Sequence, residues 1–493
     1  MATRIWPTAH EAADRAARTA VAPLVWDPAQ HVLSRFTFGP TVLSRTHVRT
    51  HGVDAWWSDQ VALGRALAGY GGAPAVAEVC PLLTESPAAV RAWLKSQGNE
   101  FGWQAMEQLS SVTLGLQAWS RAQLYETVVD FFANHLNVAN RNDDLWATRH
   151  TMDRDVIRRY AFGSYTDMLL ASARNPAMLQ YLNLASSNKV AINENYGREL
   201  LELHTVGLQA GYSEEDVKNS ARILTGRTLD ADFNYIYQPD LHWTGAVRVL
   251  GLSDTNDSAA AGEDLGDAYV RYLAGHPSTA QRLAQKLCVR YVSDKPSAAL
   301  VAAVAKVYSD SGTQILPMLT AIFHSEEFWS SRGAKTRRPT ENLIATVRAL
   351  GVRPSDMAAA LDTLKWMAAT LGNVPLDWNT PDGYPDVATA WRSSSSLISL
   401  WKYHRGFILN WWNAFAKFDP ATLYGNSRPK TSGEAIQVLT RRLTGSSFSL
   451  AHRNALQKFL AEPANTPIAK STLQWLLVHL APLILDAPYH ALR

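Results

Sequence analysis

The chain has few cysteines and few charged residues for its length. Cys80 and Cys288 are its two cysteines in 493 residues, and they form no CxxC or Cys/His pair, which excludes a disulfide framework and a structural zinc knot. Charged residues make up 18% of the chain, and 47 basic against 44 acidic residues give a net charge of +3. Because no basic block stands out, we expect no nucleic-acid partner.

Long apolar stretches and familiar catalytic motifs are also missing. The longest apolar run, residues 472–485, is interrupted by His479 and Pro482 and is too short to span a bilayer. Residues 1–23 contain no apolar segment of signal-peptide length, and Thr8 predicts the start of an amphipathic helix. The sequence therefore predicts a soluble cytoplasmic protein without a membrane span. No Walker loop, dinucleotide fingerprint, GxSxG, HExxH or kinase motif occurs, so phosphate and dinucleotide chemistry lack sequence support.

The remaining composition is that of a large helical protein. Apolar residues make up 47% of the chain, and its 17 tryptophans suggest an aromatic-rich interior. The length exceeds that of one compact unit of the usual size. We expect a mainly α fold, with many helices in an orthogonal or bundle arrangement. We divide it into an N-terminal helical region (1–80), a central helical core (81–350) and a C-terminal helical region (351–493).

One stretch, residues 227–251, has the pattern of β-structure. Tyr235 and Tyr237 alternate with less apolar neighbours, and a Gln-Pro-Asp turn follows. We expect a small β-hairpin inserted into the central region, with His242 solvated. Residues 252–265 are poor in apolar side chains and are predicted to form a mobile loop.

Polar side chains concentrate in residues 193–207, NENYGRELLELHTVG. When this stretch is drawn as a helix at 100° per residue, Tyr196, Leu200 and Leu203 mark an apolar side. His204 lies among the leucines. The other polar residues fall on or beside the opposite side: Glu194, Asn195, Arg198, Glu199 and Glu202.

Two interpretations of this helix remain open. In the first, the glutamates on either side of Arg198 form a solvated ladder of ion pairs, and His204 is a hydrogen-bonded core histidine. In the second, Asn195, Glu199 and Glu202 line a buried polar cavity that binds a metal ion or performs acid–base catalysis. Because Glu202 and His204 point to different faces, residues from other helices must complete any site.

A second polar group ends another predicted helix. His135 is flanked by Asn134 and Asn137 in FFANHLNV, and it is our first choice for a nitrogen ligand from a neighbouring helix. A helix end capped by asparagines explains the pattern equally well. Lys286 and Arg290 are four residues apart and repel each other unless acids partner them, so we expect structural ion pairs there.

Several motifs, taken in order, resemble those of one bacterial family. They are HVLSRFTFGPT, GVDAWWSDQV, FFANHLNV, the run from NPAMLQYLN to ILTG, HPSTAQRLAQKLCVRYVSD, and KTRRP followed by PDGYPD. They extend from about residue 31 to 391 and are similar to the motifs of the DUF1800 family, whose reaction is uncharacterised. The resemblance implies a largely helical fold. Many relatives look exported by the twin-arginine route and are encoded beside a sulfatase-like partner family.

The resemblance also selects particular residues. The family pattern matches this chain at His135, Asn193, Glu194, Asn195, Arg198, Glu199, Glu202 and His204. It departs at three places. The family has a second histidine where this chain has Ala133, a tryptophan where it has Arg227, and His-Asp where it has His242 and Trp243.

Together these observations predict an enzyme with a polar pocket. Our first hypothesis is an oxidoreductase that acts on a small organic or peptidic substrate. A metal-dependent hydrolase and a non-enzymatic scaffold that binds a protein partner are the alternatives. The predicted catalytic residues are Glu199, Glu202, His204 and Arg198; Asn195 and Asn134 are predicted to contact a cofactor; and His135, Glu199 and His204 are predicted to bind a divalent iron, manganese, copper or zinc ion.

Overall fold

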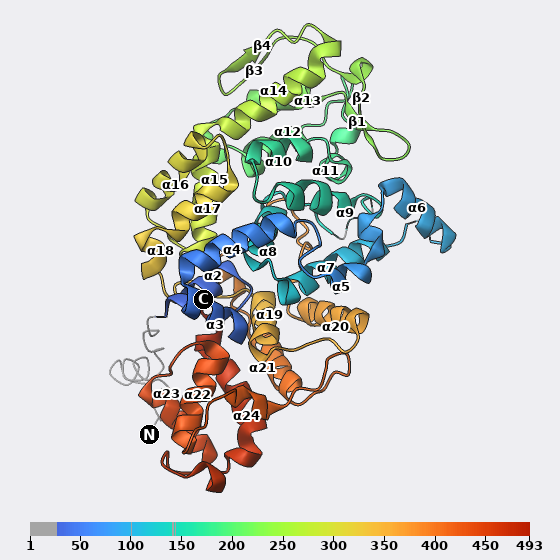
Figure 1. Ribbon diagram of the computed structural model, residues 1–493. Coiled ribbons are helices and arrows are strands. Elements are labelled where there is room, and N and C mark those ends of the chain that lie inside the picture. The colour runs from blue at the N-terminus through green and yellow to red at the C-terminus, as the bar shows by residue number, and fades with distance from the viewer. Residues whose placement is uncertain (1–26, 100, 141, 143) are drawn as a thin grey trace, which may run out of the picture.

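The computed structural model describes residues 27–99, 101–140, 142 and 144–493. The helix predicted to begin at Thr8 lies outside these residues. The described chain is mainly helical, as predicted, and its strands form two small two-stranded sheets. The molecule is elongated, with the strands at one end and the last helices at the opposite end (Figure 1).

The helices follow one another through short connections. The first are α2 (Pro28–Phe36), α3 (Val42–His51), α4 (Val53–Ala66), α5 (Pro74–Glu78), α6 (Pro87–Ser96), α7 (Gln104–Trp119) and α8 (Gln123–His135). Next come α9 (Arg149–Thr151), the π-helix η2 (Met152–Arg158), α10 (Tyr165–Ser172), α11 (Pro176–Tyr181), α12 (Asn195–Glu199), the π-helix η4 (Leu200–His204) and α13 (Glu214–Leu224).

After the strands, the chain returns to helices. They are α14 (Gly262–Gly275), α15 (Pro277–Tyr291), α16 (Ala298–Asp310), α17 (Ile315–Phe323), α18 (Glu326–Ser330), α19 (Pro339–Leu350), α20 (Met357–Thr370), α21 (Ser394–Ile408), α22 (Ser432–Thr444), α23 (Leu450–Leu460), α24 (Leu473–Leu485) and α25 (Pro488–Ala491). Single 3₁₀ turns lie at Pro81–Thr84, Leu184–Ser186, Leu208–Ala210, Pro239–Leu241, Ala259–Ala261, Ala388–Trp391, Pro420–Tyr424 and Ile468–Lys470.

Side-chain caps fix where the helices begin. At α2, the Asp27 carboxylate accepts the N–H groups of Ala29 and Gln30, and proline occupies the first helical position. At α13, Ser213 and Asp216 form a reciprocal capping box. These local signals place the helix starts without help from distant residues.

The predicted β-structure is present, but it forms two hairpins. Strand β1 (Arg227–Leu229) pairs antiparallel with β2 (Tyr235–Tyr237), and β3 (Val247–Val249) pairs with β4 (Leu252–Asp254). The predicted loop at 252–265 is therefore partly wrong, because it contains β4 and the start of α14. The Asp216 carboxylate accepts the N–H of Leu250 and fixes the turn of the second hairpin to α13, a contact that no local pattern reveals.

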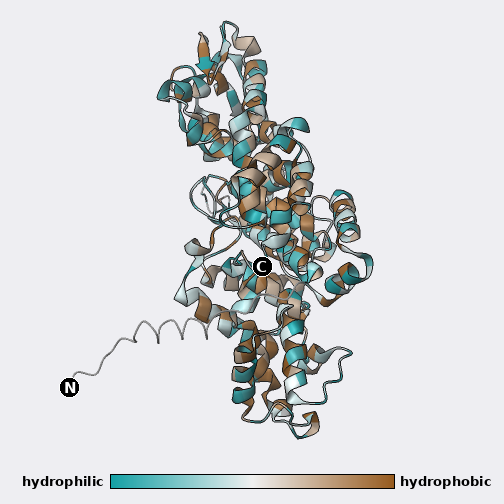
Figure 2. Ribbon diagram, turned by 90° about the vertical axis from the view of Figure 1, so that its left-hand side faces the viewer, coloured by the Kyte–Doolittle hydropathy of each residue, from teal (hydrophilic) through white to brown (hydrophobic). Residues whose placement is uncertain are grey.

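Two apolar clusters form most of the interior. The larger one gathers side chains from α2 through α18, and the second joins α7 and α19 to the carboxyl-terminal helices α20–α25. Apolar and polar residues alternate along most helices, as expected for helices that bury one face (Figure 2). The division into three regions stays a prediction. Within the described chain, no helix is both long and apolar enough to cross a membrane.

Candidate active site

The polar stretch at 193–207 departs from the regular helix predicted for it. Helix α12 passes directly into the π-helix η4, where the Thr205 hydroxyl donates to the carbonyl of Leu200 over 2.6 Å. The wider turn changes which side chains face inward, so Leu201 is fully buried while Leu203 is half-buried. The wheel at 100° per residue is therefore wrong beyond Leu200. π-turns are rare and occur frequently at functional sites.

His204, the last residue of η4, is completely buried. Neither of its ring nitrogens has a hydrogen-bond partner among the described residues, so the expectation of a hydrogen-bonded core histidine is wrong. Burial is the main cause that lowers the pKa of His204 to about 3, and the cations Lys286 and Arg282 lower it further. The imidazole is therefore neutral at physiological pH.

A chain of hydrogen bonds links His135 to η4 through residues of three helices. His135 Nε2 lies 3.0 Å from the Tyr165 hydroxyl, and that hydroxyl donates to the backbone carbonyl of His204. On the other side of the ring, His135 Nδ1 lies 2.9 Å from the Lys286 amine. Helices α8, α10 and α15 thus bring together residues that are 30 to 151 positions apart in the sequence.

These contacts determine how the His135 ring is protonated. Since the hydroxyl hydrogen of Tyr165 goes to the His204 carbonyl, Tyr165 must accept a hydrogen from His135 Nε2. Nδ1 is then free to accept a hydrogen from the Lys286 amine. Burial, followed by the charge of Lys286, holds the pKa of His135 well below its usual range, so the ring stays neutral and Nδ1 acts as a hydrogen-bond acceptor for the amine.

The arrangement also alters the pKa of Lys286. Its amine contacts His135, whereas Arg290, which we expected to need the same acids, pairs with Asp130 and Glu341. Burial is the main cause that lowers the pKa of Lys286 to about 7; Arg282 adds to the lowering and Asp382 opposes it. The side chain keeps part of its solvent exposure. We refer to the amine and the residues that act on it, His135, Arg282 and Asp382, as the Lys286 recess.

Carboxylates lie at one side of this recess. Burial raises the pKa of Glu199, and the negative charges of Glu202 and Asp382 raise it further. Asp382 is within electrostatic range of both Glu199 and Lys286. The Glu202 carboxylate accepts a hydrogen bond from the Tyr212 hydroxyl at 3.4 Å. Both glutamates keep partial exposure.

The loop that carries Asp382 is attached to the end of α8 by two asparagines. The Asn134 amide donates to the carbonyl of Tyr384 at 2.7 Å and accepts its N–H at 2.6 Å. Asn137 donates to the carbonyls at 378 and 380. Gly383 has φ +74°, and a Cβ there would lie 2.1 Å from the Asn134 carbonyl oxygen. Glycine is therefore required for the loop to approach α8 this closely.

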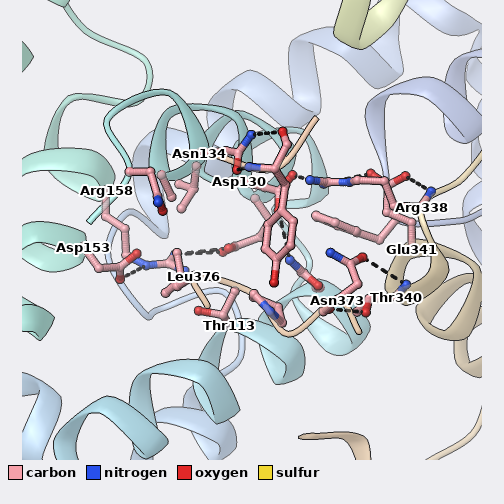
Figure 3. A pocket seen from close by; sticks show the side chains of 18 residues that line it. Thr113, Asp130, Asn134, Asp153, Arg158, Arg338, Thr340, Glu341, Asn373 and Leu376 are labelled. Atoms are coloured by element: carbon pink, nitrogen blue, oxygen red, sulfur yellow. Dashed lines mark hydrogen bonds and ion pairs between the residues drawn. The ribbon is translucent and has the colours of Figure 1, made fainter. Parts of the chain in front are cut away.

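A small cavity borders α8 and is lined in part by the same Asn134, Asn137 and Tyr384 (Figure 3). Its volume is about 30 Å³, enough for one or two water molecules. Buried ion pairs surround it, among them Arg158 with Glu126 and Asp153, and Arg338 with Asp130. Its size and its paired charges indicate a structural polar network that holds α8 in place.

Comparison with known proteins places the chain in a family. A family model described as a protein of unknown function (DUF1800) matches residues 31–492. The chain belongs to the DUF1800 family. No curated protein and no solved structure matches it.

The family residues predicted for the site have different surroundings. Arg198 forms a two-pronged ion pair with Glu214, which the ladder interpretation did not include, and a longer one with Glu194, which it did. The Asn134 amide is occupied by Tyr384. Asn195 is half-buried, and its backbone N–H is bound by the side chain two residues earlier. Their predicted catalytic and cofactor-binding roles stay predictions.

The predicted metal site of His135, Glu199 and His204 also stays a prediction. Both nitrogens of His135 are occupied, by Lys286 and Tyr165. Among the described residues, no group of three or more histidine, cysteine, aspartate or glutamate side chains is arranged to hold a metal ion. His135 would have to release one of its partners before it could bind a metal.

The departures from the family pattern lie outside the recess. Ala133 lines the cavity beside α8. Arg227 is buried and pairs with Asp267. His242, predicted to be solvated, is buried between the carbonyl of Thr225 and the side chain of Asn256. That prediction is wrong because Tyr237 and Gly262 also pack against the ring.

Sequence reasoning missed Arg282 and Tyr165, and it assigned Lys286 to a structural ion pair that is absent among the described residues. One signal was available. Arg282, Lys286 and Arg290 recur every four residues on α15, so three like charges share one face. Like charges on one face repel unless acidic residues pair with them. The pKa is lowered at Arg282 and Lys286, whereas Arg290 is paired with acids.

Proposed function

We propose that the chain is an enzyme in which the Lys286 amine attacks the carbonyl carbon of a small 2-oxo acid and forms an imine. The observation that carries this proposal is the lowered pKa of Lys286, about 7, beside the neutral ring of His135, whose Nδ1 lies 2.9 Å from the amine. An amine with this pKa is substantially neutral at physiological pH. A neutral amine next to a second cation is a recognised form of activated lysine nucleophile.

The neighbouring groups supply the proton transfers that imine formation requires. The proton that the attacking nitrogen loses passes to the carbonyl oxygen, while His135 Nδ1, 2.9 Å away, accepts the remaining N–H of the amine and orients its lone pair. The carbonyl oxygen must leave as water, which requires a proton donor. We assign this role to Glu199, whose pKa is raised and which, like Lys286, is within electrostatic range of Asp382. The balanced step converts a ketone and an amine into an imine and one water molecule.

Arg282 supports the choice of a 2-oxo acid as substrate. It lies one turn before Lys286 on α15, so both side chains project from the same face. Its Nε donates to the carbonyl of Leu203, and its pKa is lowered by burial. A carboxylate bound to its remaining N–H groups would place the adjacent ketone near the amine. The metal-dependent oxidoreductase and hydrolase hypotheses have no comparable geometric support.

Reductive trapping tests the proposal. The purified chain is incubated at pH 7.5 with pyruvate or 2-oxoglutarate and cyanoborohydride, and peptide mass spectrometry measures the adduct at each lysine. We expect Lys286 to be labelled at least tenfold faster than exposed Lys402. Arg282→Met should remove the preference for 2-oxo acids over acetone and leave trapping by acetone in place. Equal labelling of both lysines would show that Lys286 has a structural role.

A further inference from the structure

Two grooves border helix α3 and adjoin at its first turn. One has a volume of about 930 Å³ and the other of about 880 Å³. Val42, the first residue of α3, and Arg442, on α22, line both of them. Neither groove contains a residue of the Lys286 recess, so a ligand bound in them does not depend on the proposed enzymatic function.

The first groove is mainly apolar and is formed by helices that are distant in sequence. It lies between α2, α3, α4, α7 and α19, and its apolar lining includes Leu33, Trp56, Leu63, Trp119 and Val352. Leu43, at its edge, is 77% exposed. An apolar hollow of this volume is in the range that accommodates a small organic ligand.

The second groove is strongly basic. Five arginines line it against two carboxylates, a difference of three positive charges: Arg45, Arg49, Arg428, Arg441 and Arg442 against Asp27 and Glu434. Only Arg49 has a carboxylate partner among the described residues, namely Asp27. The Glu434 carboxylate accepts the backbone N–H of Lys430. The excess positive charge is therefore not neutralised within the described chain.

Arg442 stands where the apolar and basic grooves meet. Its Nε is buried and has no hydrogen-bond partner among the described residues. Its backbone carbonyl is occupied by Arg45, which donates over 2.7 Å. Burial lowers the pKa of Arg45 to about 10, and the charges of Arg442 and Arg49 add to the lowering. A bound anion would relieve this repulsion.

We propose that the two grooves together bind one monomeric, single-chain amphiphile with an anionic carboxylate or phosphate headgroup. The alkyl chain lies in the apolar groove and the headgroup contacts Arg442 at the junction. Charge complementarity selects the anion, and the apolar lining selects the chain. A membrane surface is a poorer match, because helices that lie on membranes present a continuous exposed apolar face, whereas this apolar surface is recessed.

Isothermal titration of the full chain with decyl phosphate, below its micelle concentration, tests this site. We expect one molecule bound per chain. Octyl phosphate, which is two methylenes shorter, should bind about 16-fold more weakly, since each buried methylene strengthens binding about fourfold. 1-Decanol and inorganic phosphate should each bind at least tenfold more weakly than decyl phosphate, because each has only one of the two recognition elements.

Three variants, whose folding is checked by circular dichroism, locate the ligand. Arg442→Gln should weaken decyl phosphate at least tenfold and leave 1-decanol unchanged. Ala62→Trp places an indole in the apolar groove and should weaken both ligands at least tenfold. Arg65→Gln is the matched control, because Arg65 is exposed on α4 and lines neither groove; it should change neither affinity.

Several outcomes would overturn the proposal. They are equal affinity for octyl and decyl phosphate, equal effects of the two arginine variants, and inorganic phosphate binding as tightly as decyl phosphate. Binding only to anionic vesicles would identify a membrane surface instead. Binding only after removal of residues 1–26 would identify the chain's own segment as the occupant. A dimer that Ala62→Trp dissociates would identify a second copy.

Discussion

Replacing Lys286 with methionine gives the most direct measure of the electrostatics of the recess. Burial lowers the pKa of the folded lysine from 10.5 to about 7, so the unfolded chain holds the proton more tightly than the folded chain does. Stability therefore rises with pH wherever the unfolded state binds more protons. Burying the charged amine lowers the unfolding free energy by its full amount below pH 7. This destabilisation decreases between pH 7 and 10.5 and is absent above that range.

The shift sets the size of the effect. One pKa unit corresponds to about 1.4 kcal/mol, and 10.5 − 7 = 3.5 units, so the cost below pH 7 is at most about 5 kcal/mol. Between pH 7 and 9 it falls by about 2 kcal/mol. Methionine does not titrate, but it leaves His135 Nδ1 without its hydrogen-bond donor, a constant loss of about 1–3 kcal/mol. The unfolding free energy of the wild type minus that of the variant should therefore increase by about 2 kcal/mol from pH 7 to pH 9.

Urea denaturation of both proteins at pH 6, 7, 8 and 9 measures the difference. Lys402→Met is the matched control, because Lys402 is exposed on α21 and meets water in the folded and unfolded chain alike. We expect its difference from the wild type to stay constant with pH. If the Lys286 difference is equally constant, or if it changes in the opposite direction, the amine is not buried as described and the nucleophile assignment fails with it.

Three further predictions concern Tyr165, Arg198 and a bound metal ion. Tyr165→Phe should slow reductive trapping at least tenfold and destabilise the fold by about 1–3 kcal/mol, because the His204 carbonyl loses its donor; trapping rates and urea denaturation check this, and an unchanged rate would remove tyrosine from the proton pathway. Arg198→Ala should change the unfolding free energy by less than about 1 kcal/mol, because its ion pairs are at the surface. Trapping should also be unaffected, and a tenfold loss would return Arg198 to the catalytic set. Prior treatment with a chelator should leave trapping unchanged; activity that is lost and then restored by zinc or iron would instead support a metal at His135.

Much of the fold could be predicted from the sequence because its signals are local. The Ser213 capping box and the amphipathic pattern of most helices depend on residues within a few positions of one another. The second hairpin could not be predicted in the same way, because its turn is held by Asp216, 34 residues earlier. The π-turn at 200–204 is a further limit, since a wheel with a fixed angle assumes the regularity that this turn interrupts.

The candidate site shows the same limit more strongly. The sequence could indicate that 193–207 and His135 matter, since both are dense in polar residues. It could not indicate that Arg290 rather than Lys286 receives the acids, because Asp130 and Glu341 come from α8 and α19. The chemistry of α15 thus depends on which cation those two helices neutralise. The family motif at η4 reaches this lysine only indirectly, because the His204 carbonyl binds Tyr165 and Tyr165 binds His135.

The three departures from the family pattern have a physical meaning in this fold. Ala133 lines the cavity beside α8. Arg227 pairs with Asp267, and His242 is hydrogen-bonded to the carbonyl of Thr225. None of them contacts the hydrogen-bonded chain from Lys286 through His135 to the η4 carbonyl. A histidine at 133 would have to fit beside the ion pairs of a cavity that holds one or two waters, so that change alters the support of α8. Divergence at these positions is therefore compatible with an intact recess in this member of the family.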